Sequence, residues 1–117
     1  MSQAAATSGL AVYDRAVEAA VIALSLAVKV PAPLKPIADQ LIRSASSVPA
    51  NLAEGHSRAS RNRAHLWRIA YGSAKEVDSH PRLLVAAGAV NRERAADSLK
   101  VFDHVRAMTW CLLHTGR

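Results

Sequence analysis

Apolar side chains recur every three or four positions between residues 10 and 28, which is the spacing of one face of an amphipathic helix. The stripe predicted to face a core consists of Leu10, Tyr13, Val17, Ala20, Leu24 and Ala27, widened by Val21 and Val28. Val12, Ile22 and Leu26 lie off this stripe, so the helix carries more apolar surface than one small core needs. The proline-rich stretch 31–36 ends the helix, because proline clashes with a preceding helical turn.

A second helix is predicted from about Pro36, where a first turn tolerates proline. Its inward stripe consists of Ile37, Leu41, Ala45, Val48 and Leu52. Pro49 lies inside this helix and cannot donate a hydrogen bond to Ala45, so we expect a kink there. Gly55 is expected to end the helix as a residue with left-handed backbone.

The third helix is predicted to begin near Ser57 or Ser60, either of which can cap it, and to reach about Gly88. Its stripe consists of Leu66, Ile69, Ala70, Ser73, Val77 and Leu84. Pro81 is expected to bend or shorten it. Asn91 is expected to cap a last helix. The inward face of that helix consists of Leu99, Phe102, Val105, Met108 or Thr109, and Leu112.

Four helices with short connections predict an all-α fold, an antiparallel up-down-up-down four-helix bundle. A chain of 117 residues supports one core, so we expect a flexible tail over residues 1–9 and a single domain over 10–117. The longest apolar run, 19–28, is too short to span a membrane, and no basic residue precedes Arg15 as a secretion signal requires. A cytoplasmic location is expected. The single cysteine, Cys111, excludes an intramolecular disulfide or a thiolate metal cage.

Charge adds a candidate partner to this picture. The chain carries 15 Lys and Arg against 9 Asp and Glu, a net charge of +6, and most of the cations are arginine. A small basic protein attracts polyanions over long range, so nucleic acid is the first partner to consider. Surface solubility, or pairing across a subunit interface, explains the same surplus of arginine.

The densest basic run contains no acidic residue and consists of His56, Arg58, Arg61, Arg63, His65 and Arg68. We predict that Arg58, Arg61, Arg63 and Arg68 are exposed and bind nucleic acid, because arginine forks and the first amides of a helix both suit phosphate. Trp67 and Tyr71, one helical turn apart, are candidates to stack on bases. In the alternative interpretation the two rings pack into the bundle or an oligomer seam, and the arginines are merely solvated.

Catalytic and metal chemistry find little support in the residue spacing. Arg58 and His65 match, loosely, the spacing of the helical HEPN-type ribonucleases, in which such a pair transfers protons and stabilises phosphate. A chain this rich in arginine contains such a spacing by chance. A carboxylate-bridged metal pair needs duplicated Glu-x-x-His motifs, and Glu76 with His80 has the wrong spacing. We therefore expect no metal, no cofactor and no catalytic residues.

One long segment resembles a known family. Residues 40–55 read Gln-Leu-Ile-Arg-Ser-Ala-Ser-Ser-Val-Pro-Ala-Asn-Leu-Ala-Glu-Gly. This run is similar to the signature of the bacterial "four helix bundle protein" family, also called the 23S rRNA intervening-sequence proteins. Residues 10–16 and 70–76 resemble the family's Leu-x-Val-Trp-x-x-Ala and Ala-x-Gly-Ser-x-x-Glu, with Tyr13 in place of Trp. His65 and the pair His80-Pro81 depart from the pattern.

The resemblance implies a left-handed antiparallel bundle that assembles as a ring-like homopentamer. It also implies kinship with accessory proteins of diversity-generating retroelements, which bind a reverse transcriptase and nucleic acid, and no established catalytic activity. Within the signature, we interpret Arg43, Pro49, Asn51, Glu54 and Gly55 as structural, holding the kink or a subunit seam, because proline and glycine leave backbone groups unpaired. Ligand binding by Arg43, Asn51 and Glu54 is the alternative.

The leading hypothesis is a non-enzymatic, oligomeric bundle that associates with RNA or a ribonucleoprotein through its basic surface. One alternative is a retroelement accessory protein whose main partner is a reverse transcriptase. The enzymatic alternative is a metal-independent ribonuclease that uses Arg58 and His65.

Overall fold

The computed structural model describes residues 8–115 and contains four long helices within that range. They are α2 (Gly9–Ala27), α3 (Lys35–His56), α4 (Ser60–Ala86) and α5 (Arg92–Thr115), with a short 3-10 turn η1 (Ala32–Leu34) before α3. The predicted all-α four-helix fold is confirmed. Most of the expected tail, residues 1–7, lies outside the described range, and Gly9 already belongs to α2.

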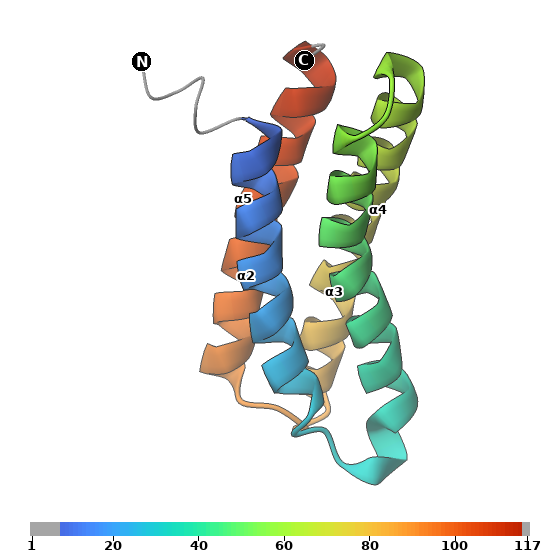
Figure 1. Cartoon of the computed structure of the whole chain (residues 1–117). Coiled ribbons are helices and arrows are strands. Elements are labelled where there is room, and N and C mark those ends of the chain that lie inside the picture. Colours follow the sequence, from blue (N-terminus) through green and yellow to red (C-terminus); the bar gives the residue numbers. More distant parts are fainter. Residues whose placement is uncertain (1–7, 116–117) are drawn as a thin grey trace.

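In cross-section the four helices lie at the corners of a square. Each helix packs against the next one in the chain, and α5 packs against α2. Figure 1 shows that neighbours run in opposite directions, as the up-down-up-down prediction requires. The upper end in Figure 1 contains the start of α2, the connection from α3 to α4 and the end of α5. Within residues 8–115, no helix combines the length and hydropathy needed to span a bilayer.

The predicted core face of α2 is only partly right, because Ala20 and Ala27 of the predicted stripe are buried and its larger aliphatic members are not. The structure buries Val12, Ala16, Ala19, Ala23 and Leu26, among others, on this helix. Three members of the predicted stripe, Leu10, Val17 and Leu24, are exposed instead. Both sides of α2 are apolar, so periodicity alone could not choose between them. The alanine-rich side fits a narrow space, because small side chains let neighbouring helices approach closely.

The other three helices bury the faces that their spacing predicts, with few exceptions. Fully buried positions of the predicted stripes include Leu41, Ala45, Val48, Val77, Leu84 and Val105. Phe102, at 1% exposure, is the largest side chain that is fully buried among the described residues. Ile69, which was predicted to face inward, is exposed.

Neither internal proline ends its helix. Helix α3 continues through Pro49 to His56, and α4 continues through the buried Pro81 to Ala86, so the expected shortening at Pro81 is wrong. Each proline removes only one backbone hydrogen bond, and packing against the neighbouring helices keeps the remaining turns in place.

The helix ends confirm one predicted cap and correct another. Asn91 caps α5, because its Oδ1 accepts hydrogen bonds from the second and third helical amides at 2.8 and 3.1 Å. Neither Ser57 nor Ser60 caps α4, whose cap position is Ala59 without a side-chain hydrogen bond. Gly88, with φ +74°, follows the end of α4 in the left-handed conformation that closes a helix C-terminus.

Gly55 lies inside α3 without a positive φ, so the predicted left-handed cap is wrong. Its lack of a side chain instead makes room for Trp67 of α4. A Cβ atom at Gly55 would lie 2.7 Å from Trp67 Cδ1, 2.8 Å from its Nε1 and 3.2 Å from the carbonyl oxygen of Arg63. The indole Nε1 also donates a hydrogen bond to the carbonyl oxygen of Leu52, at 3.4 Å. Glycine is therefore required here by close approach between α3 and α4.

We expect Gly55→Ala to lower the free energy of unfolding by about 1–3 kcal/mol, because the added methyl group forces the indole or the α4 backbone to shift. Gly72 is the matched control, since no atom lies within 4 Å of the position its Cβ would occupy. Gly72→Ala should raise stability by about 0.5–1 kcal/mol through helix propensity. Denaturant titrations followed by circular dichroism at a fixed protein concentration measure both. Equal effects of the two substitutions would contradict the assigned role of Gly55.

Candidate nucleic-acid interface

Arg63 is directed at the end of α3 and is half-buried, contrary to the expectation that it is exposed. Its Nε donates to the carbonyl oxygen of Gly55 at 3.2 Å, and its Nη2 donates to that of His56 at 3.0 Å. The guanidinium also lies over the Trp67 ring, 5.6 Å from the centroid. Arg63 thus satisfies carbonyl groups that the end of α3 leaves without helical partners, and we leave it out of the candidate interface.

Arg58 lies in the connection between α3 and α4 and forms an ion pair with Glu54, one turn earlier. Both side chains are about half exposed, at 52% and 51%. Glu54 therefore has its ion-pair partner within one helical turn. Across residues 8–115, no hydrogen bond joins Arg58 to His65, the two residues of the ribonuclease alternative.

Arg61 and Arg68 belong to a longer row of cations on α4. Arg61, Arg68, Lys75 and Arg82 follow one another at intervals of seven residues, and all four are exposed. Seven residues are almost two helical turns, so each cation lies about 10.5 Å beyond the previous one, with a drift of about 20° around the axis. We call these four residues the cationic stripe. Lys75 and Arg82 were missed from the sequence, although their spacing was a signal.

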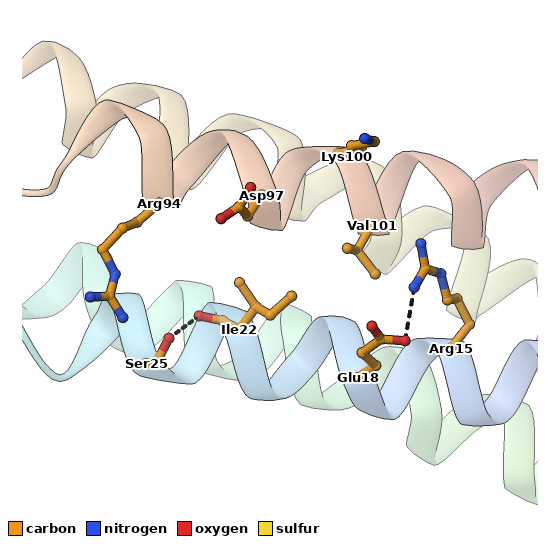
Figure 2. A pocket seen from close by; sticks show the side chains of 8 residues that line it. All are labelled: Arg15, Glu18, Ile22, Ser25, Arg94, Asp97, Lys100 and Val101. Carbon is orange, nitrogen blue, oxygen red and sulfur yellow. Dashed lines mark hydrogen bonds and ion pairs between the residues drawn. The ribbon is translucent and has the colours of Figure 1, made fainter.

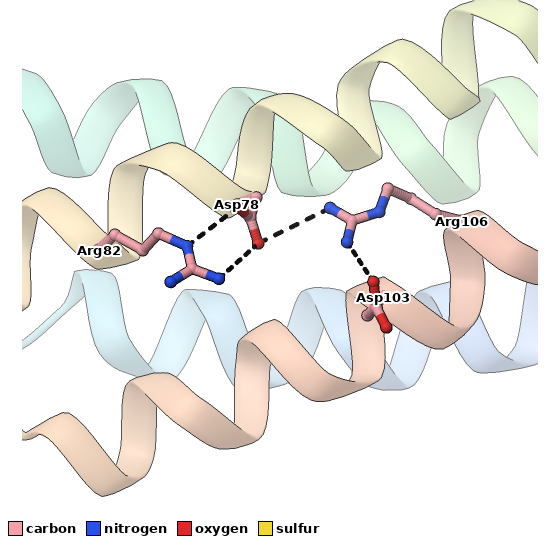
Figure 3. A network of polar contacts seen from close by, with 4 residues as sticks. All are labelled: Asp78, Arg82, Asp103 and Arg106. Carbon is pink, nitrogen blue, oxygen red and sulfur yellow. Dashed lines mark hydrogen bonds and ion pairs between the residues drawn. The ribbon is translucent and has the colours of Figure 1, made fainter.

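The lower end of the cationic stripe, at Arg82, is neutralised by acidic neighbours (Figure 3). Arg82 Nε donates to Asp78 Oδ2 at 3.0 Å, and Arg106 of α5 lies 3.7 Å from Asp78 Oδ1 while it also binds Asp103. The hydrogen bond from Asp78, and then its charge, raises the pKa of Arg82 further above its usual range. Arg82 is therefore a permanent cation that already has a partner.

The upper part of the cationic stripe is different. Among the described residues, neither Arg61 nor Arg68 has a hydrogen-bond or ion-pair partner, and both are exposed. Helix α4 also starts at this end, and its first amides receive no side-chain cap. Unpaired cations and the positive end of a helix dipole thus occupy one end of the bundle.

The two aromatic side chains beside these arginines are not equivalent. Trp67 is only 4% exposed and packs in the core, so the prediction that it stacks on bases is wrong. Tyr71 is half-buried, and Lys75 Nζ lies 5.8 Å from the centroid of its ring. For Trp67, the alternative interpretation of a packing residue is confirmed.

Hydrogen bonds between polar side chains join two segments that resemble the family pattern, residues 40–55 on α3 and residues 70–76 on α4. Asn51 Nδ2 lies 2.9 Å from both the carbonyl oxygen and the Oγ of Ser47, and Ser47 Oγ lies 2.8 Å from Ser73 Oγ on α4. Asn51 therefore stabilises the turn of α3 that contains Pro49 and helps to join α3 to α4. A polar groove of about 430 Å³ adjoins these hydrogen bonds and is lined by Gln40, Arg43, Ser44, Ser47, Ser73 and Glu76.

A second groove, of about 500 Å³, runs between α2 and α5 (Figure 2). It is lined by Arg15, Glu18, Ile22, Ser25, Arg94, Asp97, Lys100 and Val101. Arg15 pairs with Glu18 at 2.8 Å and donates from Nε to His104 Nδ1 at 3.0 Å. Charges of both signs alternate along its walls, so this groove has little preference for a polyanion. In the part of the chain that the structure describes, no three His, Cys, Asp or Glu side chains are grouped to hold a metal ion.

Comparison with known proteins agrees with the geometry. Residues 8–110 match the family described as 23S rRNA-intervening sequence protein. The chain belongs to this family. A crystal structure of a protein of unknown function, from the S23 ribosomal protein family of Bacteroides thetaiotaomicron, has the same fold. Its TM-score is 0.82 at 20% sequence identity, covering 91% of this chain and 97% of that chain. A comparison with curated proteins found no match.

For this 23S rRNA-intervening sequence family member, we expect Arg63 and Arg61 to respond differently to substitution. Arg63→Ala should lower the free energy of unfolding by about 1–2 kcal/mol, because the carbonyl oxygen of His56 loses the guanidinium donor and that of Gly55 keeps only the Arg58 amide. Arg61→Ala should change it by less than about 0.5 kcal/mol, because this exposed side chain has no hydrogen-bond or ion-pair partner within residues 8–115. Thermal melts of the two variants test this difference. A neutral Arg63→Ala would show that Arg63 does not fasten α3 to α4.

Proposed function

We propose that the protein is a non-enzymatic, oligomeric bundle that associates with RNA through the upper part of its cationic stripe. The observation that carries the proposal is the pair Arg61 and Arg68, exposed on one face of α4 without a partner among the described residues. The surplus of positive charge on the whole chain, +6, supports it. Arginine forks bind phosphate bidentately, and such contacts hold a nucleic acid without reading its sequence.

The oligomer is proposed to form along the exposed side of α2. The large aliphatic side chains there are Leu10, Val17, Val21, Leu24 and Val28, with exposures from 37% to 80%. From Val17 onward they alternate at spacings of four and three, which is the pattern of a helix–helix seam. A second copy of the chain would remove this apolar surface from water. The family resemblance suggests five copies in a ring, in which the cationic stripe would recur on every subunit and multiply a weak affinity.

The non-enzymatic part of the proposal is supported by the state of Arg58. Its guanidinium pairs with Glu54, and His65 is exposed on α4 without a hydrogen bond to Arg58 among the described residues. A ribonuclease would need both side chains directed at one phosphate.

The RNA proposal predicts a change in salt dependence. Replacing Arg61 and Arg68 together by Gln should weaken the binding of unrelated RNA sequences about equally. If each arginine neutralises one phosphate of a single strand, the slope of log K against log salt should flatten by about 1.4. Fluorescence anisotropy over a range of salt concentrations measures both quantities.

The matched control for this experiment replaces Arg92 and Arg94, two exposed arginines at the opposite end of the bundle, by Gln. This variant has the same net charge as the first. If both variants lose the same RNA affinity, net charge alone explains the effect. That result would contradict an interface at Arg61 and Arg68. Absence of any RNA binding by the wild type would refute the proposed function.

The seam proposal predicts that Val21→Glu with Val28→Glu dissociates the oligomer, because buried carboxylates without partners are costly. Both side chains are well exposed in the single chain, at 59% and 80%, so its fold should remain. Leu83→Glu on α4, at a position 51% exposed, is the control and should leave the assembly intact. Multi-angle light scattering should give several times the 12.5 kDa chain mass for the wild type and the control. A monomeric wild type would exclude the seam.

A further inference from the structure

Trp110 is an exposed aromatic side chain that neither the core nor the proposed interface uses. It is one of two tryptophans in the chain. The other, Trp67, is 4% exposed, whereas Trp110 on α5 is 49% exposed. The inward face of α5 passes through Val105, Met108 and Leu112, and Trp110 lies on the outer side of the helix. A large ring held half in water contributes little to folding and leaves part of its surface accessible to a ligand.

The indole of Trp110 is held in place by His114, one turn further along α5. Their ring centroids are 3.8 Å apart, and the ring planes differ by 19°, so the two rings are stacked. His114 Nδ1 lies 2.9 Å from the carbonyl oxygen of Trp110. A carbonyl oxygen only accepts, so Nδ1 carries the hydrogen, and this bond orients the imidazole. The pair is therefore a pre-organised flat surface, and a bound base would order few further side chains.

The register of α4 and α5 places this pair beside the cationic stripe. The Arg106–Asp78 pair, with 3.7 Å between Nη1 and Oδ1, shows where the two antiparallel helices meet. Trp110 follows Arg106 by four residues, about 6 Å towards the upper end, on nearly the same face of α5. Lys75 precedes Asp78 by three residues, about 4.5 Å in the same direction. Trp110 thus lies next to the part of α4 that contains Lys75 and Tyr71, below the unpaired Arg68.

An exposed, fixed aromatic ring beside a row of cations is the arrangement that binds single-stranded nucleic acid. Phosphates contact the cations while bases stack on the ring, and stacking tolerates any sequence because every base has a π face. Bases in a duplex are already stacked on their neighbours and do not present a free face to a protein side chain. The ring therefore adds affinity for unpaired bases, whereas the cations attract both forms of RNA.

We propose that Trp110, supported by His114, is a stacking platform for an unpaired base of single-stranded RNA whose phosphates follow the cationic stripe. The proposal rests on the proposed RNA association and specifies which form of RNA is preferred. It assigns the specificity for single strands to α5 and the charge attraction to α4.

The test is a binding titration of the full chain with an unstructured RNA of about a dozen nucleotides and with its duplex form, followed by anisotropy of a labelled RNA. The wild type should prefer the single strand. Trp110→Ala should weaken single-strand binding about tenfold, leave duplex binding unchanged and leave the salt slope unchanged, because no phosphate contact is lost. Trp110→Phe, which keeps an aromatic face, should retain most of the affinity. Leu83→Ala, another exposed apolar position, is the matched control and should have no effect.

Intrinsic fluorescence gives an independent measurement. The single strand should quench the emission of the wild type and not that of Trp110→Phe, in which the buried Trp67 is the remaining indole. Equal binding of the two RNA forms, with no effect of Trp110→Ala, would overturn the platform and leave the RNA association standing. If the Trp110→Ala variant has a lower mass in light scattering, Trp110 belongs to a subunit interface. That result would also overturn the stacking platform. Wild-type protein that binds neither form would refute the RNA association itself, and the platform with it.

Discussion

The contact of Trp67 with Gly55 determines how α4 lies against α3, and the candidate interface depends on it. The indole occupies the space that a side chain at Gly55 would need, and Arg63 covers the ring while it bonds the last carbonyl groups of α3. With Arg63 and Trp67 directed inward, the helical period directs Arg61 and Arg68 outward. The close approach of α3 and α4 therefore gives Arg63 a structural role and leaves Arg61 and Arg68 as candidate phosphate ligands.

The alanine-rich inner face of α2 has a comparable effect on the opposite side of the bundle. Small side chains at Ala16, Ala19 and Ala23 let α2 pack close to its neighbours. The larger aliphatic side chains of α2 consequently face outward, where a single chain leaves them in water. This distribution gives the molecule an apolar side on α2 and a basic edge on α4, which are the two surfaces that an assembling, RNA-associating protein would need.

The cationic stripe is uneven because the acidic neighbours on α4 and α5 change along its length. Near Arg82, Asp78 and Asp103 balance the positive charges of α4 and α5. Towards the upper end no described acidic side chain pairs with Arg61 or Arg68. Four cations with the same spacing therefore differ in their availability to a polyanion, and the seven-residue spacing alone does not reveal the difference.

Local periodicity and turn chemistry were sufficient to predict the four helices, their order, the Asn91 cap, most of the core of α3 and α5, and the basic region around Arg61. These features depend on residues within a few turns of one another. The tertiary structure decided which face of α2 is buried and why residue 55 must be glycine. It also decided that Arg63 is directed inward, and that Trp67 is buried while Trp110 is exposed. Each of these depends on the volume left between helices, or on a contact between residues distant in the chain, and helical spacing carries no information about either.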